Sequence, residues 1–274
     1  MLKRVMRGLS AIVALALLLA SPVSGDVQAV GPCGGNFCVY LPLITKVCGN
    51  APLGQSYGTS LTSGPITDRP AAQHPDLNLS IRGYVLAANQ IKQLVDYGGD
   101  TDPAAPHLGT LFNPARLPTF SNNYDVYDWN WSTMTRGQLL SQITPWPVTL
   151  LGLQTNPDEV IQLPERVGGN IYIDPLSRQA RVLYAETTRI TLKYTSEDNV
   201  VSGYTLQIEN ICVDPDLLSL YQQMNAAGRT YLPALTGKQP IGRALGTEIR
   251  VTVRDTGTFG DPRSCKDNWV GNGC

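Results

Sequence analysis

The clearest alternation of hydrophobic and polar residues lies near the end of the chain, in EIRVTVR, residues 248–254. Isoleucine and valine take every second position, and charged residues or threonine take the others. Because successive side chains of a strand point to opposite faces, this pattern predicts a strand with one buried and one polar face. The run then breaks at Asp255-Thr-Gly and at Asp261-Pro262, which are turn sequences. A polar face of this kind can hold a metal or a ligand.

Six other short runs rich in β-branched and aromatic residues precede this strand. They are PVTLLGLQ, EVIQLP, NIYI, ARVLYAE, RITLKYT and GYTLQIEN, separated by turn clusters at roughly 8–14-residue spacing. This spacing predicts a mainly β fold, with an antiparallel sandwich or barrel-like domain over residues 146–262. One short helix, DPDLLSLYQQMNAAG, interrupts the strands; Asp214 and Pro215 suit its start and Gly228 its end.

Residues 71–145 form a loop-rich N-terminal part of the body. The segment ANQIKQLVDY fits either a short helix or a strand, and its periodicity does not decide between them. In YDVYDWNW aromatic and polar residues alternate, which predicts a strand with Tyr127, Trp129 and Trp131 on one face. We expect that face to pack into the core and the aspartates to face water.

The first 25 residues have the pattern of a secretory signal. A basic start, MLKRVMR, precedes the apolar AIVALALLLA and small residues that suit cleavage after Gly25 or Ala29. No later stretch reaches the roughly 18 apolar residues of a membrane-spanning helix. We therefore expect a secreted or cell-envelope protein, extracytoplasmic and not embedded in the membrane once the signal is removed.

Residues 26–70 are a Cys-, Gly- and Pro-rich spacer with one apolar island, FCVYLPLITKV. Its CVYLPLI segment resembles the N-terminal segments of exported Chloroflexota proteins, which favours a bacterial source. The net charge is −1 and only 16% of residues are charged, with no basic patch, so the composition excludes nucleic acid as a partner.

All six cysteines follow the signal segment: Cys33, Cys38, Cys48, Cys212, Cys265 and Cys274. An even number of cysteines in an exported chain predicts disulfides. Proximity favours Cys265–Cys274, within the tail 263–274, and one pair among the first three. A metal site at Cys33 and Cys38 is the rival interpretation, but no histidine lies nearby.

Candidates for catalysis are few. The only histidines are His74 and His107, whereas a hydrolytic zinc site needs about three protein ligands and an open position. His74 and Asp76, in HPDLN, are weak metal candidates, and a surface turn is the simpler interpretation. Nucleophile-elbow, phosphate-loop and dinucleotide motifs are absent, so no cofactor is expected.

A glycosidase needs only two carboxylates, so a pair of acidic residues offers an alternative catalytic site. Asp125 and Asp128 lie beside tryptophans that can stack on sugar rings, and Glu186 and Glu197 form a second candidate pair. The segment EDNVVSGY, which begins at Glu197, is interpreted as a solvated hairpin.

The order of four segments in residues 200–262 resembles the lysostaphin/LytM-type zinc metallopeptidases, the peptidoglycan endopeptidases with a duplicated hybrid motif. These segments are SGYTLQIEN, LLSLYQQM, LPALTGKQPIGRALG and TEIRVTVRDTGTFGDP. The best matches are GKQPIG (237–242), Gly257 and Asp261-Pro262. The family's first zinc motif, His-x3-Asp, has no counterpart at the expected distance, because HPDLN lies about 70 residues too early.

Departures from the family's motifs imply a protein without peptidase activity. The resemblance places Gln223 where the family has its catalytic histidine, Arg250 at a zinc-ligand histidine and Glu248 at the neighbouring one. Arginine has no lone pair to offer a cation. We expect a groove with Gln223, Glu248, Arg250 and Arg254 that binds peptidoglycan, or an extracellular peptide or glycan, without cutting it. An active hydrolase, either a zinc peptidase or a two-carboxylate glycosidase, and a structural assembly protein are the alternatives.

Overall fold

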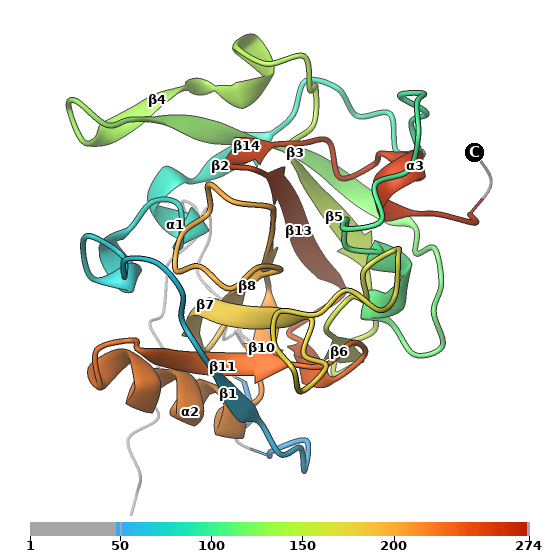
Figure 1. Cartoon of the computed structure of the whole chain (residues 1–274). Coiled ribbons are helices and arrows are strands. Elements are labelled where there is room, and N and C mark those ends of the chain that lie inside the picture. Colours follow the sequence, from blue (N-terminus) through green and yellow to red (C-terminus); the bar gives the residue numbers. More distant parts are fainter. Residues whose placement is uncertain (1–47, 50, 273–274) are drawn as a thin grey trace, which may run out of the picture. The chain divides into compact units, whose positions relative to one another are not determined.

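A computed structural model describes residues 48–49 and 51–272, which fall in the compact unit Lys46–Cys274 (Figure 1). The architecture is mainly β, as the alternation predicts. An 11-stranded antiparallel sheet has the strand order β1-β11-β7-β8-β9-β13-β5-β3-β2, with β4 paired to β3 and β14 paired to β13. A 3-stranded sheet has the order β10-β12-β6. The signal segment, most of the spacer, Cys33, Cys38 and Cys274 lie outside the described residues.

The strands have the following bounds: β1 (Gly58–Leu61), β2 (Tyr84–Leu86), β3 (Phe120–Asn130), β4 (Thr135–Leu139), β5 (Leu150–Gln154), β6 (Val160–Gln162), β7 (Ala180–Glu186), β8 (Arg189–Lys193), β9 (Tyr204–Glu209), β10 (Ile211–Val213), β11 (Tyr231–Leu235), β12 (Pro240–Ala244), β13 (Glu248–Asp255) and β14 (Thr258–Phe259). The helices are α1 (Leu79–Arg82), α2 (Pro215–Ala226) and α3 (Cys265–Asn268), with 3-10 turns at Ala71–Gln73, Leu108–Leu111 and Leu140–Gln142. Within the described ranges, no helix is both long and apolar enough to span a bilayer.

The predicted helix is α2. The Asp214 side chain accepts hydrogen bonds from the backbone N–H groups of Asp216 and Leu217, and Pro215 occupies the first turn, as expected. Gly228, just beyond the end, has φ of 89°, the left-handed conformation that terminates helices. The helix packs on β7 and β11, at one side of the large sheet (Figure 1).

Six of the seven predicted runs in residues 146–262 form strands, and NIYI does not. Its residues belong to a loop in which Ile173 N–H bonds to the Arg178 carbonyl, closing a turn instead of extending a sheet. The segment ANQIKQLVDY is neither helix nor strand; its Val95 forms an isolated bridge with Ser264. Asn123 and Arg263 both donate to the Ile91 carbonyl.

The resemblance implies a hairpin in LPALTGKQPIGRALG, yet its two strands lie in different sheets. β11 pairs with β1 and β7, whereas β12 pairs with β10 and β6. β2, β3 and β4, from the loop-rich residues 71–145, belong to the large sheet and continue it beyond β5.

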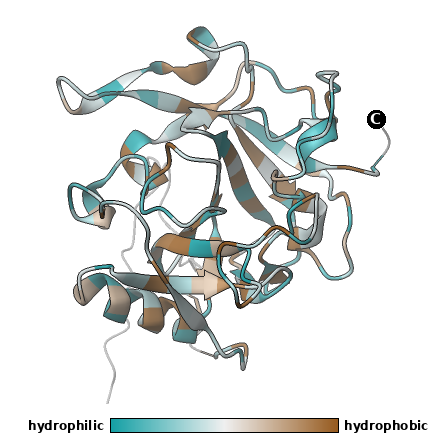
Figure 2. Cartoon of the chain, in the orientation of Figure 1, coloured by the Kyte–Doolittle hydropathy of each residue, from teal (hydrophilic) through white to brown (hydrophobic). Residues whose placement is uncertain are grey.

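The strand β13 has the predicted alternation, visible as bands of colour in Figure 2. Ile249, Val251 and Val253 lie in the main hydrophobic core. Thr252 and Arg254, on the opposite face, are also buried, at 0% and 4% exposure. The polar face is therefore covered by protein over much of its length instead of facing water.

Residues 74–82 provide part of that cover. Gln207 of β9 donates to the Asp76 carbonyl at 3.0 Å, and Thr191 of β8 donates to the Leu77 carbonyl at 2.6 Å. The HPDLN segment, which is distant from β13 in sequence, thus packs directly on the polar face of the central strands.

One described disulfide joins Cys48 to Cys212, which are 164 residues apart in sequence. It ties the start of the described chain to β10, a pairing that proximity in sequence does not predict. Cys265 is disulfide-bonded as well, but its predicted partner, Cys274, lies outside the described residues. A disulfide indicates an oxidising, extracytoplasmic environment.

Candidate functional site

Glu248 and Arg250 lie together at one end of β13. The Glu248 carboxylate accepts hydrogen bonds from Ser121, from Asn122 at 2.9 Å, from Tyr124 at 2.8 Å, and from Arg250 at 2.7 Å. Arg250 also donates to the Tyr84 hydroxyl at 2.9 Å. Its guanidinium lies 5.4 Å and 4.6 Å from the ring centres of Tyr84 and Tyr124. We call these six residues the Arg250 cluster.

The charges of the Arg250 cluster satisfy one another. Burial raises the pKa of Glu248, but the hydrogen bonds from Ser121 and Arg250 outweigh this effect and hold the pKa below its ordinary value. Burial alone would lower the pKa of Arg250. The hydrogen bond to Glu248 outweighs burial, so the pKa of Arg250 lies above its ordinary value. A cavity of about 440 Å³ lies beside both side chains. The cluster therefore has little unused charge for a ligand.

Two predicted groove residues lie elsewhere. Arg254 points to the buried polar face, where it forms an ion pair of 2.8 Å with Asp76, and Asp76 also pairs with Arg82 at 2.6 Å. Gln223 lies on the exposed side of α2. Because α2 packs on β7 and β11, at least three strands from β13, Gln223 does not join the cavity beside Glu248 and Arg250.

The weak metal candidates are engaged in other interactions. The His74 ring packs edge-on against Trp131 at 5.6 Å, and its Nε2 lies 3.6 Å from Asp68. Burial lowers the pKa of His74, although Asp76 and Asp68 act against it. Burial likewise lowers the pKa of His107, which lies far from His74 in sequence. Nowhere in the described ranges do three or more His, Cys, Asp or Glu side chains group in a way that could hold a metal ion.

The expected orientation of YDVYDWNW is wrong. Asp125 is buried, at 1% exposure, whereas the Trp131 side chain is 44% exposed beyond the end of β3. The burial of Asp125 is possible because its carboxylate accepts hydrogen bonds from Ser141 and from Thr149. Asp128 lies 3.5 Å from Arg82, on the side of the strand that is partly exposed.

The second candidate pair of carboxylates consists of one residue in an ion pair and one residue with a buried oxygen. Glu186 pairs with Arg189, and one carboxylate oxygen of Glu197 is buried without a hydrogen-bond partner. The EDNVVSGY hairpin is not fully solvated as expected. Its Asp198 is buried, at 1% exposure, because Arg229 pairs with it at 2.6 Å.

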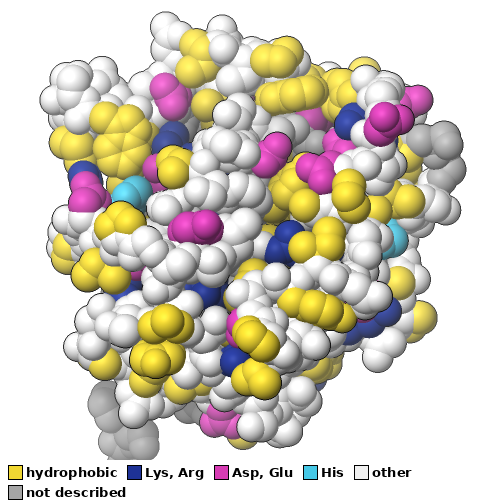
Figure 3. Space-filling view, in the orientation of Figure 1, with side chains coloured by type: hydrophobic (Ala, Val, Ile, Leu, Met, Phe, Trp, Pro, Cys, Tyr) yellow, Lys and Arg dark blue, Asp and Glu magenta, His cyan; other side chains and the backbone are white. Residues whose placement is uncertain are grey.

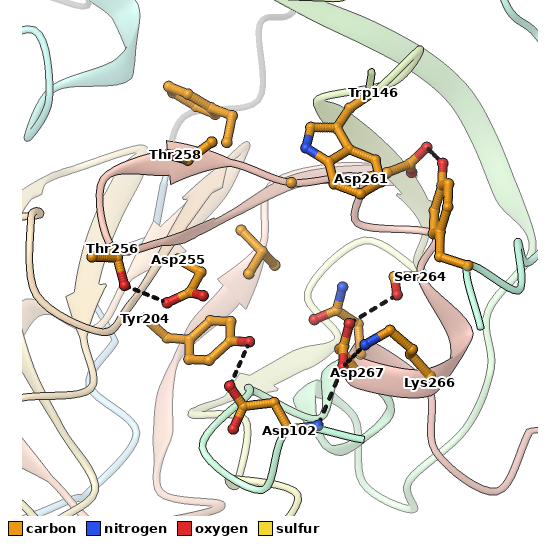
Figure 4. A pocket seen from close by; sticks show the side chains of 15 residues that line it. Asp102, Trp146, Tyr204, Asp255, Thr256, Thr258, Asp261, Ser264, Lys266 and Asp267 are labelled. Carbon is orange, nitrogen blue, oxygen red and sulfur yellow. Dashed lines mark hydrogen bonds and ion pairs between the residues drawn. The ribbon is translucent and has the colours of Figure 1, made fainter. Parts of the chain in front are cut away.

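Another cavity lies at the opposite end of β13, where the sequence predicted no site. Its volume is about 550 Å³, and we call it the Trp146 pocket (Figure 4). Four separate segments form it: residues 97–102, Trp146, Tyr204 at the start of β9, and residues 253–268. Its lining residues are Tyr97, Asp102, Trp146, Tyr204, Val253, Asp255, Thr256, Thr258, Phe259, Gly260, Asp261, Ser264, Lys266, Asp267 and Asn268.

Aromatic rings of the Trp146 pocket are fixed by contacts with each other and with carboxylates. The Tyr97 and Trp146 rings meet edge to face, with centres 4.8 Å apart, and the Tyr97 hydroxyl donates to Asp261 at 2.8 Å. The Tyr204 hydroxyl donates to Asp102 at 3.0 Å. Burial raises the pKa of Tyr204, and Asp102 and Asp255 raise it further, so the phenol keeps its proton.

The Trp146 pocket has an excess of negative charge. Arg263 pairs with Asp261 at 2.6 Å, and Lys266 pairs with Asp267 at 3.1 Å. The other two carboxylates, Asp102 and Asp255, have no ion pair with any residue that the structure describes. Figure 4 shows Tyr204 between these two. In the space-filling view, acidic side chains gather on the upper right of the face, around apolar ones (Figure 3).

A buried acceptor without a partner completes the Trp146 pocket. Asn268 is 3% exposed, and its Oδ1 atom has no hydrogen-bond partner. A buried acceptor of this kind costs about 1–3 kcal/mol until a donor reaches it. The pocket therefore has aromatic surface, two carboxylates without an ion pair among the described residues, and one unsatisfied amide oxygen buried in its wall.

Comparison of the chain with protein-family models, with characterised proteins and with solved structures found no match.

Proposed function

We propose that the protein is an exported binding protein whose β domain holds a saccharide in the Trp146 pocket without cleaving it. The observation that carries the proposal is the combination of aromatic rings and hydrogen-bonding side chains around one open cavity of about 550 Å³. Ligand sites typically combine apolar walls with a few placed polar groups. The Cys48–Cys212 disulfide supports a site of action outside the cytoplasm.

The chemistry of a sugar ring matches this lining. The C–H faces of a pyranose pack on aromatic rings such as Trp146, whose side chain is only partly buried. Sugar hydroxyls donate to carboxylates and amide oxygens, which here are supplied by Asp102, Asp255 and Asn268. Thr258 and Lys266 offer donors in return. A ligand of this kind satisfies both the apolar and the polar parts of the pocket.

The ion pairs and hydrogen bonds of the pocket carboxylates favour binding without cleavage. A glycosidase needs one carboxyl group to donate a proton and a second to act as nucleophile or base. Asp261 and Asp267 already pair with Arg263 and Lys266, and Asp102 accepts the Tyr204 hydroxyl. Glycoside hydrolysis remains the second candidate function, because Asp255 projects into the same pocket.

We propose that the saccharide comes from the bacterial cell envelope. The resemblance of residues 200–262 to lysostaphin/LytM-type peptidases, which act on peptidoglycan, supports this choice. The site proposed here differs from the groove that the resemblance implies, since it lies at the far end of β13 from Glu248 and Arg250.

A sedimentation assay with insoluble cell-wall glycan tests the proposal. Trp146→Ala should reduce the bound fraction about tenfold, as expected for loss of roughly 1.4 kcal/mol of ring contact. The matched control is Trp131→Ala, which removes an exposed tryptophan outside the pocket. Equal binding by the wild type and Trp146→Ala would sink the proposal. Loss of binding by Arg250→Ala alone would favour the Arg250 cluster instead.

The same samples distinguish binding from hydrolysis. Soluble reducing ends are measured after prolonged incubation of glycan with the protein. A rise above the protein-free control that Asp255→Asn abolishes would make the protein a glycosidase and refute the non-catalytic assignment.

A further inference from the structure

We propose that the Trp146 pocket selects saccharides that carry free amino groups, whose positive charge is attracted by Asp102 and Asp255 on either side of Tyr204. This inference rests on the proposed function and specifies the ligand class. A hexosamine without its acetyl group supplies both the sugar ring and the cation.

The first observation is charge. Asp102 and Asp255 are the two pocket carboxylates without an ion pair among the described residues, and both lie beside Tyr204. Two carboxylates without an ion pair, next to a buried ring, favour a cation and disfavour anionic ligands. The Tyr204 hydroxyl donates to Asp102, which orients that carboxylate without neutralising its charge.

The second observation is independent of charge. The buried Oδ1 atom of Asn268 lacks a donor, and Asn268 lines the same pocket. An ammonium group has three N–H donors and no acceptor, and it can therefore bond to several acceptors at once. An acetylated amine offers one N–H and no charge, so it satisfies fewer of these groups.

Aromatic surface contributes to the same preference. Tyr97, Trp146 and Tyr204 all line the cavity, and the electron-rich face of such rings attracts a cation. A neutral sugar gains the ring contact but not this attraction. The pocket should therefore distinguish two ligands that differ only in N-acetylation.

Calorimetric titration with chitosan and chitin hexamers tests the inference, because these ligands differ only in N-acetylation. In mildly acidic buffer, where the amines are protonated, we expect chitosan to bind about tenfold more tightly than chitin. Asp102→Asn and Asp255→Asn should each remove most of this preference, so that the two hexamers bind each variant with similar affinity. Asp68→Asn, an exposed acidic residue on another surface, is the matched control.

Each outcome addresses a different claim. Equal affinity for the two hexamers overturns the amine selectivity and leaves glycan binding intact. Binding of spermidine with no binding of either hexamer refutes the saccharide proposal. Failure of all three ligands refutes both proposals. Chemical re-acetylation of the chitosan hexamer, which changes only the ligand, should abolish the preference even if a variant is unstable.

Discussion

Replacing Asp76 by asparagine tests the ion-pair network that closes the polar face of the central strands. Asp76 bridges Arg82 and Arg254 at 2.6 Å and 2.8 Å, and both arginine side chains are at most 5% exposed. Burial raises the pKa of Asp76, but Arg254 and Arg82 outweigh burial and hold this pKa below its ordinary value. The carboxylate is therefore charged at neutral pH and balances two buried cations.

The expected loss follows from the cations that remain. Removing one member of a buried ion pair costs about 3–5 kcal/mol, because the remaining charge stays buried. Arg82 keeps a contact with Asp128, and Arg254 keeps its bonds to the Gly257 carbonyl, which places the loss near the lower end, about 3 kcal/mol. For a domain of this size, this loss corresponds to a fall in melting temperature of roughly 6–12 °C.

Urea denaturation followed by circular dichroism measures the free energy of unfolding of the wild type and of Asp76→Asn. Asp68→Asn is the control, because its ion pair with Arg69 is exposed and contributes well under ~1 kcal/mol. The pKa of Asp76 is lower in the folded state than in the unfolded state, where it is about 4. The carboxylate therefore contributes its full stability above the unfolded-state pKa, and this contribution is lost as pH falls through the folded-state pKa. The difference between wild type and Asp76→Asn should therefore shrink below about pH 4. Equal losses in the two variants would refute the reasoning.

Three other changes test separate parts of the fold. Replacing both Cys48 and Cys212 by serine removes a cross-link spanning 164 residues and should cost about 2–4 kcal/mol in urea denaturation; an unchanged midpoint would contradict this. A Cβ atom at Gly242 would lie 2.3 Å from the Cys212 carbonyl oxygen, whereas one at Gly246 meets nothing within 4 Å. Gly242→Ala should therefore lower the melting temperature by several degrees and Gly246→Ala should not; equal melting temperatures would argue against this packing. Burial lowers the pKa of Lys193 to about 8, so the folded state loses this proton before the unfolded state does. The free energy of unfolding of the wild type should rise relative to Lys193→Met between about pH 8 and 10, and parallel pH profiles would contradict the burial.

Local sequence patterns were sufficient to predict much of the β architecture. Alternation identified β13, and runs of β-branched residues identified five more strands, because these residues are buried on at least one face. Asp214 and Pro215 located the start of α2 because helix capping depends on neighbouring residues alone.

The same reasoning failed where burial depends on distant partners. Asp125 and Asp198 are hydrophilic residues that the sequence places in water, yet hydrogen bonds and ion pairs from other segments make their burial possible. Cys48 pairs with Cys212 because the fold brings together residues that are 164 positions apart. Neither kind of contact leaves a periodic signal.

The Trp146 pocket was missed for a related reason. Its residues come from four segments that are separate in the sequence, and no single segment contains a recognisable site motif. The signal available in the sequence was the tail 263–274, where Lys266, Asp267 and Asn268 follow the conspicuous Asp261-Pro262 turn. Their relation to Trp146 depends on the path of β13 and the segments beside it, which only the structure shows.

The central claim is that a saccharide binds in the Trp146 pocket, and nuclear magnetic resonance tests it most directly. The side-chain indole N–H signals of Trp129, Trp131, Trp146 and Trp269 are recorded while a glucosamine oligomer is added. Trp269 is an internal reference, because its indole is buried and donates to the Pro262 carbonyl. We predict that the Trp146 signal shifts progressively and saturates while the other three stay in place. Saturating shifts confined to Trp129 or Trp131, with Trp146 unchanged, would contradict the account.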